Sequence, residues 1–150
     1  MEIGQSIRQS RFRNEHQKAM INVLYTYGWL MDRVKTHFKD HDVTPQQFNI
    51  LRILRGSNPQ PLTVLDLKER MLDKNCDASR IIERLVVKGL TKKKICVSDK
   101  RRVDISITPK GLKLLDTLDG YNDRLDAVLK TLTDDEAAEL NRLLDKLRND

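Results

Sequence analysis

Cysteine, glycine, proline and aromatic residues are all scarce in this chain of 150 residues. There are two cysteines, six glycines and four prolines, and aromatic residues make up 5% of the sequence. Two cysteines cannot supply a disulfide framework, so we expect Cys76 and Cys96 to be reduced thiols of a cytoplasmic protein. No apolar run is long enough for a transmembrane span, and the first residues lack the layout of a signal peptide.

Residue groups that would indicate catalysis are absent as well. The sequence shows no paired nucleophile and base, no Gly-rich phosphate loop and no metal-binding cluster. We therefore expect no enzymatic activity, no catalytic residue, no metal and no cofactor. His37 and His41 have the spacing of two metal ligands on one helix face. A helix is expected to end between them, however, so structural or solvent-exposed roles are favoured.

Charge is what the sequence has in abundance. The net charge is +6 and the pI is about 9.4. Residues 66–113 hold fourteen Lys and Arg against seven Asp and Glu, whereas residues 114–150 hold five against ten. A basic middle favours a polyanionic partner, but a solvated charged surface is the alternative, and charge alone favours that alternative.

Hydrophobic periodicity predicts a mainly α-helical chain. A long, Pro-free helix is expected over about residues 7–39, with an apolar stripe on one face. That stripe consists of Met20, Leu24, Tyr27, Met31, Val34 and Phe38. Further helices are expected from residue 45, over 63–71, 76–88 and 109–132, and from residue 133 onward.

Helix-start and helix-stop signals separate these segments. Thr44, Thr63, Thr108 and Thr133 each stand where a side-chain oxygen can cap the following helix. Gly89 follows the helix expected over residues 76–88, and glycine there commonly adopts the left-handed conformation that ends a helix.

A single β-hairpin is expected after Gly89, because the apolar period changes from near 3.6 to 2. Ile95 and Val97 alternate with polar residues, and after the charged turn 99–102 the alternation resumes at Val103 and Ile105. Two helices followed by a hairpin with a basic tip form a winged helix-turn-helix. In that arrangement the second helix fits the major groove of duplex DNA and the hairpin tip fits the minor groove.

The sequence resembles the MarR family of multiple-antibiotic-resistance regulators. Residues 99–111, DKRRVDISITPKG, are similar to that family's wing pattern, and residues 77–85, DASRIIERL, are similar to its recognition helix. The resemblance implies one domain over 1–150, with a winged-helix lobe at about 44–108. It also implies a homodimer, formed by terminal helices at about 7–39 and 109–150, on a palindromic site in double-stranded DNA.

The resemblance also implies which residues contact DNA. Arg101 is expected in the minor groove, with Asp99 orienting an arginine of the wing. Asp77 either reads a base edge or caps its helix, and the residues leave both roles open. The full set expected to contact DNA is Asn75, Cys76, Asp77, Ser79, Arg80, Arg84, Lys100, Arg101 and Arg102.

Two further expectations concern regulation. Relatives bind small aromatic or phenolic effectors, and Tyr25, Trp29 and Arg55 could line such a pocket, although packing within the core is the favoured interpretation. Cys76 is expected at a helix N-terminus near basic residues, conditions that lower a thiol pKa. A redox role for Cys76 is therefore a minor hypothesis.

The leading functional hypothesis is a sequence-specific transcription regulator, more specifically a repressor relieved by a small ligand. A nonspecific architectural DNA-binding protein would use the same basic wing. A winged-helix protein-interaction module is a third alternative, and for it the wing charges would be incidental.

Overall fold

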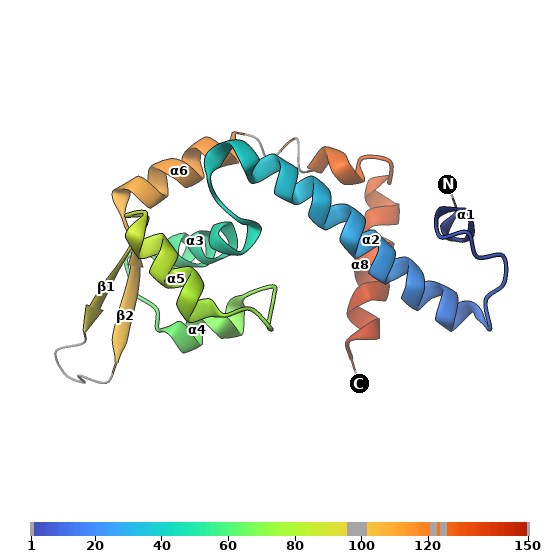
Figure 1. Ribbon diagram of the computed structural model, residues 1–150, viewed down its shortest axis with the longest axis horizontal. Helices are drawn as coiled ribbons and strands as arrows, with labels where there is room; N and C mark the ends of the chain where they lie inside the picture. Colours follow the sequence, from blue (N-terminus) through green and yellow to red (C-terminus); the bar gives the residue numbers. More distant parts are fainter. Residues whose placement is uncertain (1, 96–101, 121–122, 124–125, 150) are drawn as a thin grey trace. The chain divides into compact units, whose positions relative to one another are not determined.

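The computed structural model describes residues 2–95, 102–120, 123 and 126–149. The chain divides into two compact units, Met1–His37 and Phe38–Asp150. Figure 1 shows the order of the elements along the chain. Among the described residues, no helix is long and apolar enough to cross a membrane.

The first unit consists of a short helix, α1 (Ile3–Ser6), and most of the long helix α2 (Glu15–Phe38). The expected start near residue 7 is wrong, because Arg8 takes a left-handed backbone with φ 54° and the chain becomes helical at Glu15. Asn14 caps the new start, since its Oδ1 accepts the N–H of Gln17 at 2.8 Å.

The apolar stripe expected on the long helix faces outward over much of α2. Met20 is 57% exposed, Leu24 64% and Tyr27 60%. Large apolar side chains exposed side by side on a helix are typical of an interaction surface.

The second unit begins with a sharp change of direction. Phe38 is followed by a 3₁₀ turn, η1 (Lys39–His41), so the helix does end between His37 and His41 as expected. Asp42 then takes a left-handed backbone with φ 50°. The next helix, α3 (Pro45–Ser57), begins with the predicted capping box formed by Thr44.

Two further helices complete the helix-turn-helix. Thr63 caps α4 (Val64–Arg70), and α5 (Ala78–Val87) follows after a turn. The chain leaves α5 through Gly89, whose φ of 69° confirms the expected left-handed termination.

The hairpin comprises β1 (Thr91–Ile95) and β2 (Val103–Ile107), paired antiparallel with Thr91 opposite Ile107. The first strand therefore begins earlier than the alternation of Ile95 and Val97 indicated. Leu62 pairs with Ile105 on the other edge of β2, through N–H···O bonds of 3.0 and 2.8 Å.

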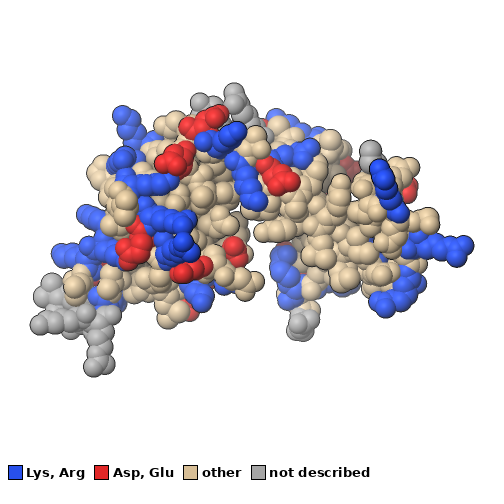
Figure 2. Space-filling view, viewed as in Figure 1, with Lys and Arg blue, Asp and Glu red and all other residues tan. Residues whose placement is uncertain are grey.

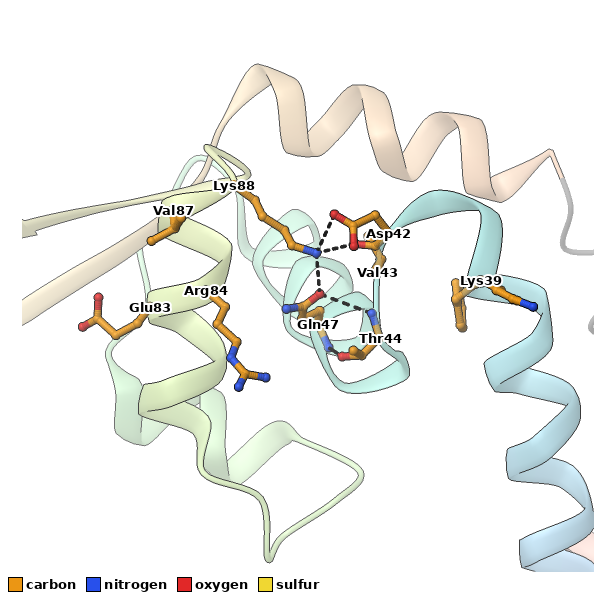
Figure 3. Close-up of a pocket in the computed structure, with 10 residues that line it drawn as sticks. Lys39, Asp42, Val43, Thr44, Gln47, Glu83, Arg84, Val87 and Lys88 are labelled. Atoms are coloured by element: carbon orange, nitrogen blue, oxygen red, sulfur yellow. Dashed lines mark hydrogen bonds and ion pairs between the residues drawn. The ribbon is translucent and has the colours of Figure 1, made fainter.

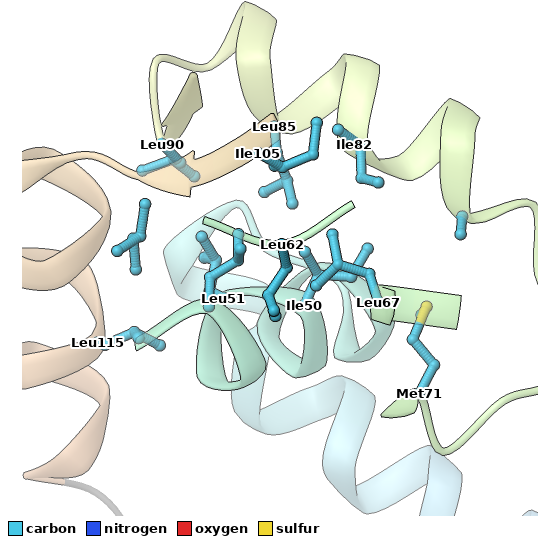
Figure 4. Close-up of a cluster of buried hydrophobic side chains, with 13 residues drawn as sticks. Ile50, Leu51, Leu62, Leu67, Met71, Ile82, Leu85, Leu90, Ile105 and Leu115 are labelled. Carbon is cyan, nitrogen blue, oxygen red and sulfur yellow. The ribbon is translucent and has the colours of Figure 1, made fainter. Parts of the chain in front are cut away.

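The hydrophobic core lies where α3, α4, α5, β2 and α6 meet (Figure 4). Ile50, Leu67, Ile82, Leu85 and Ile105 are completely buried there. This core fixes α5 against the hairpin, so residues on the outer side of α5 and on β1 have defined relative positions.

Beyond the hairpin, α6 (Pro109–Asp119) begins with Thr108 as its cap and ends at Gly120, so the expected continuous helix to residue 132 is wrong. A 3₁₀ turn, η2 (Ala127–Leu129), precedes α8 (Asp134–Leu147), which starts with the predicted capping box of Thr133 and Glu136.

Candidate DNA-binding interface

Helix α5 has one buried and one exposed side. Ala78, Ile82 and Leu85 are at most 4% exposed and pack into the core. The opposite side presents four exposed polar residues: Ser79, Arg80, Glu83 and Arg84. A helix anchored this way leaves a row of polar side chains free to contact a partner such as a DNA groove.

At the start of α5, Asp77 takes the capping role, one of the two that the sequence left open. Its carboxylate Oδ1 accepts the backbone N–H of Arg80 at 3.0 Å, so Asp77 is the helix cap. Asn75 is exposed in the preceding turn, where its backbone N–H donates to Asp73 Oδ1 at 3.1 Å.

Arg80 and Arg84 are the two cations on the exposed side of α5. Neither guanidinium forms an ion pair with a carboxylate within the part of the chain that the structure describes. Unpaired guanidinium groups on an exposed helix side suit phosphate oxygens or guanine edges.

The expected wing residues fall partly outside the described part. Asp99, Lys100 and Arg101 lie in the undescribed segment 96–101. Arg102 lies just before β2, and its Nε donates to Asp104 Oδ1 at 2.9 Å. Half of the Arg102 side chain remains exposed, so it is still accessible to a phosphate.

Strand β1 adds basic residues that the sequence interpretation did not assign. Lys92 and Lys94 are exposed on one face of the hairpin, whereas Lys93 on the other face pairs with Glu83 of α5. The available signal was the run of three lysines in a strand, where alternate residues must face opposite sides. Figure 2 shows Lys and Arg side chains gathered over α5 and the hairpin, with a few acidic residues between them.

Cys76 does not match the expectation of a lowered thiol pKa. Burial is the main cause that raises its pKa, and the carboxylate of Asp73 adds to the effect. Its Sγ lies 3.4 Å from the Sδ of Met71. The pKa is raised because the thiol is half-buried beside the core rather than open to solvent at the helix end.

The three residues suggested for an effector pocket lie in different surroundings. Tyr25 is 45% exposed, and the Trp29 ring is covered by the Arg33 guanidinium, 3.8 Å from the ring centroid. Arg55 pairs with Asp119 of α6 at 2.6 Å. Tyr25 and Trp29 belong to the first unit and Arg55 to the second.

The second unit contains a cavity of about 570 Å³ that these three residues do not line. It lies between the residues that follow α2 and the C-terminal half of α5 (Figure 3). Beside it, Lys88 Nζ contacts the carbonyl and carboxylate oxygens of Asp42, the latter at 3.1 Å, and lies 3.4 Å from Gln47 Oε1. Arg84 and Val87 of α5 also line the cavity.

Comparison with known proteins agrees with this geometry. A profile of the MarR family matches residues 43–103, which include α3, α4, α5 and β1. The HTH-type transcriptional regulator MgrA of Staphylococcus aureus is 32% identical over 110 residues, which make up 73% of this chain and 73% of MgrA. The chain belongs to the MarR family.

Solved MarR-type structures share the fold. A mutant MarR from E. coli complexed with operator DNA matches with a TM-score of 0.79 and 25% identity, over 92% of this chain and 99% of that one. BpsR of Bordetella bronchiseptica, whose DNA binding is regulated by 6-hydroxynicotinic acid, matches with a TM-score of 0.80 and 19% identity, over 94% and 99%. This MarR-family chain is thus a winged helix-turn-helix transcription regulator that binds DNA, and its relatives are regulators rather than enzymes.

Proposed function

We propose that this chain is a repressor that binds a palindromic site in duplex DNA as a homodimer and that a small ligand releases it. The observation that carries the DNA contact is the exposed side of α5, where Arg80 and Arg84 have no carboxylate partner among the described residues. In a winged helix-turn-helix this helix enters the major groove.

The apolar surfaces of two helices support the homodimer. On α2, Met20, Leu24 and Tyr27 are more than half exposed. On α8, Leu143 is 45% exposed and Leu147 69%. Such surfaces are unfavourable in water, and a second copy of the same chain can cover each of them.

Sedimentation of the wild-type chain and of the variant Leu24→Glu tests the homodimer. We expect a dimer for the wild type and a shift toward monomer for the variant, because a carboxylate in an apolar interface must be desolvated. Leu24 lies outside the core around Ile105, so an unchanged helical circular-dichroism signal of the whole chain serves as the folding control. A wild-type chain that sediments as a monomer would contradict the proposal.

Selection of genomic fragments followed by affinity measurements tests the sequence-specific function. A regulator should prefer the selected palindrome to random duplex by about a thousandfold or more. Equal affinity for both would instead favour the nonspecific architectural protein. Failure to bind any duplex at low salt would favour the protein-interaction module.

Release by a ligand is supported by the cavity beside α5 and by the regulation of BpsR by 6-hydroxynicotinic acid. A ligand that binds the free protein more tightly than the DNA complex weakens DNA binding, at most by the ratio of its two affinities. The test is titration of the operator complex with 6-hydroxynicotinic acid and with 2,4-dichlorophenol, which another transcriptional regulator of similar fold binds in its solved structure. Loss of DNA binding with one of these compounds, but not with toluene, an aromatic that has no polar group, is the expected result.

A further inference from the structure

Lys93 lies on the hairpin face that carries the buried Thr91, Ile105 and Ile107 as well as the exposed Ile95. The register places Lys93 opposite Ile105, which is completely buried, and between Thr91 and Ile95 on its own strand. Cross-strand partners point to the same face of a sheet, so Lys93 belongs to the face that packs on the lobe. Its side chain is 29% exposed, although Lys93 as a whole residue is exposed. A carboxylate partner holds such a lysine against the lobe.

The partner is a carboxylate on the recognition helix. Lys93 Nζ donates to Oε1 of Glu83 on α5. Glu83 shares the exposed side of α5 with Arg80 and Arg84. Figure 3 shows the Glu83 carboxylate pointing away from Lys88 at the other side of the helix. The two charges therefore form a direct link between α5 and strand β1.

The neighbouring lysines differ from Lys93 in both direction and pairing. Lys92 is opposite Ser106 and Lys94 is opposite Asp104, so both lie on the outer face of the hairpin. Both are exposed, and neither belongs to an ion pair within the described ranges. Lys92 and Lys94 can meet phosphates, whereas the Lys93 ammonium already contacts a carboxylate.

We infer that Glu83 and Lys93 are positioning residues for DNA binding, which hold the first strand of the wing at a fixed separation from the recognition helix. The inference rests on the proposed placement of α5 in DNA. A duplex offers its grooves at fixed distances, so a wing that is already held in place loses less conformational freedom on binding. The pair also accounts for the presence of Glu83 on the helix side proposed to face phosphates, because Lys93 compensates its negative charge.

The variants Glu83→Gln and Lys93→Met test this role through operator affinity measured over a range of salt concentrations. Removal of an acid beside DNA should strengthen binding on Coulombic grounds alone. We expect the opposite for Glu83→Gln, a loss of about two- to fivefold, because the link to β1 is lost. Lys93→Met should show a similar loss without a change in the slope of log affinity against log salt. The double variant should bind about as weakly as either single variant.

Matched controls separate positioning from simple charge loss. Lys92→Met removes the same charge one residue away, and its effect should simply add to that of Glu83→Gln. Lys93→Arg keeps a cation that can pair with Glu83, so it should retain the wild-type affinity. In the free protein, the amides of β1 should exchange hydrogen faster in Glu83→Gln than in the wild type, while the melting temperature stays nearly constant.

Three results would overturn the inference. The first is equal or tighter operator binding by Glu83→Gln. The second is a salt slope that falls by about 0.9 in Lys93→Met, the sign of a lost phosphate contact. The third is unchanged amide exchange in β1. If the wild-type chain shows no preference for its selected operator, the proposed function fails, and amide exchange in the free protein still decides whether the pair holds β1.

Discussion

Arg55 and Asp119 join helix α3 to the last turn of α6, with Arg55 Nη1 2.6 Å from Asp119 Oδ2. The other carboxylate oxygen of Asp119 lies 2.9 Å from Arg52 Nη1. A carboxylate in the last turn of a helix faces the negative end of the helix dipole. The two arginines therefore stabilise a charge that α6 itself disfavours, and they join the C-terminal end of α6 to α3.

Asp119→Asn should destabilise the lobe. Both arginines lose an ionised partner, and Arg55 is only 27% exposed, so we expect a loss of about 1–2 kcal/mol in the free energy of unfolding. Urea denaturation at fixed protein concentration measures it. Asp116→Asn is the matched control, because that carboxylate is 76% exposed and 3.7 Å from Arg55, and its loss should be below about 0.5 kcal/mol. Equal effects of the two variants would contradict the prediction.

Gly111→Ala should destabilise the fold more than the addition of one methyl group suggests. An added Cβ would lie 2.4 Å from the carbonyl oxygen of Leu90 and 2.8 Å from Cγ1 of Ile107, so the backbone must shift. We expect a loss of about 1–3 kcal/mol. Gly56→Ala provides the contrast, since nothing lies within 4 Å of its added Cβ and Gly56 is helical. That variant should gain about 0.5–1 kcal/mol. Thermal melting of both variants measures these changes. A Gly111→Ala protein as stable as the wild type would contradict the predicted steric clash.

Acid should weaken α4 through Asp66. Its side-chain hydrogen bond with Thr63, and then its bond to the Thr63 backbone N–H, lower the pKa of this carboxyl below the ordinary value of 3.8. A carboxyl whose pKa is lower in the folded state stabilises the fold above the unfolded pKa, and this contribution is lost as pH falls through the folded value. The free energy of unfolding of Asp66→Asn should therefore differ most from that of the wild type at neutral pH. The two values should converge in acid, as urea denaturation over a range of pH would show.

The Asp66 prediction has an independent check in Thr63→Ala. Without the hydroxyl donor the pKa of Asp66 should rise toward 3.8, as NMR titration of the carboxyl carbon would show. A pKa that stays unchanged in Thr63→Ala would mean that another group lowers it.

The thiol of Cys76 should react slowly at neutral pH. Burial raises its pKa from the ordinary value of 9.0, so the nucleophilic thiolate is scarce. In a Cys96→Ser background, the rate of iodoacetamide alkylation should keep rising with pH beyond 9. A rate that levels off below pH 7 would restore the redox hypothesis, and mass spectrometry after mild peroxide offers a second readout.

Arg80→Ala should reduce operator affinity and lower the salt slope by about 0.9, because one cation–phosphate contact is lost. Arg101→Ala is expected to behave alike, although Arg101 lies outside the described residues. Arg142→Ala removes the same charge from α8, where Arg142 pairs with Glu139 at 2.7 Å, and should leave the slope unchanged. An unchanged slope for Arg80→Ala across the salt titration would contradict the proposed contact between Arg80 and a phosphate.

Local signals made much of the fold predictable. Threonine caps located the starts of α3, α4, α6 and α8, and Gly89 located the end of α5, because each depends on backbone groups only a few residues away. The start of α2 was missed because Asn14 is a cap inside a stretch with no proline to interrupt the helical pattern.

The site was less predictable than the fold. The exposed side of α5 follows from its periodicity, so the exposure of Ser79, Arg80 and Arg84 could be predicted, whereas their contact with DNA stays a prediction. The pairing of Lys93 with Glu83 depends on how the hairpin packs on α5, and the sequence interpretation did not identify it. The raised pKa of Cys76 likewise depends on burial, a tertiary property.

Lys88 ties the end of the recognition helix to the place where the chain turns after α2. Its ammonium contacts both the carbonyl and the carboxylate of Asp42, while its own carbonyl accepts from Lys110 Nζ at 2.8 Å. The left-handed Asp42 is thus anchored from outside its own segment. A substitution that displaces Asp42 would therefore remove two contacts of Lys88, the residue that ends the recognition helix.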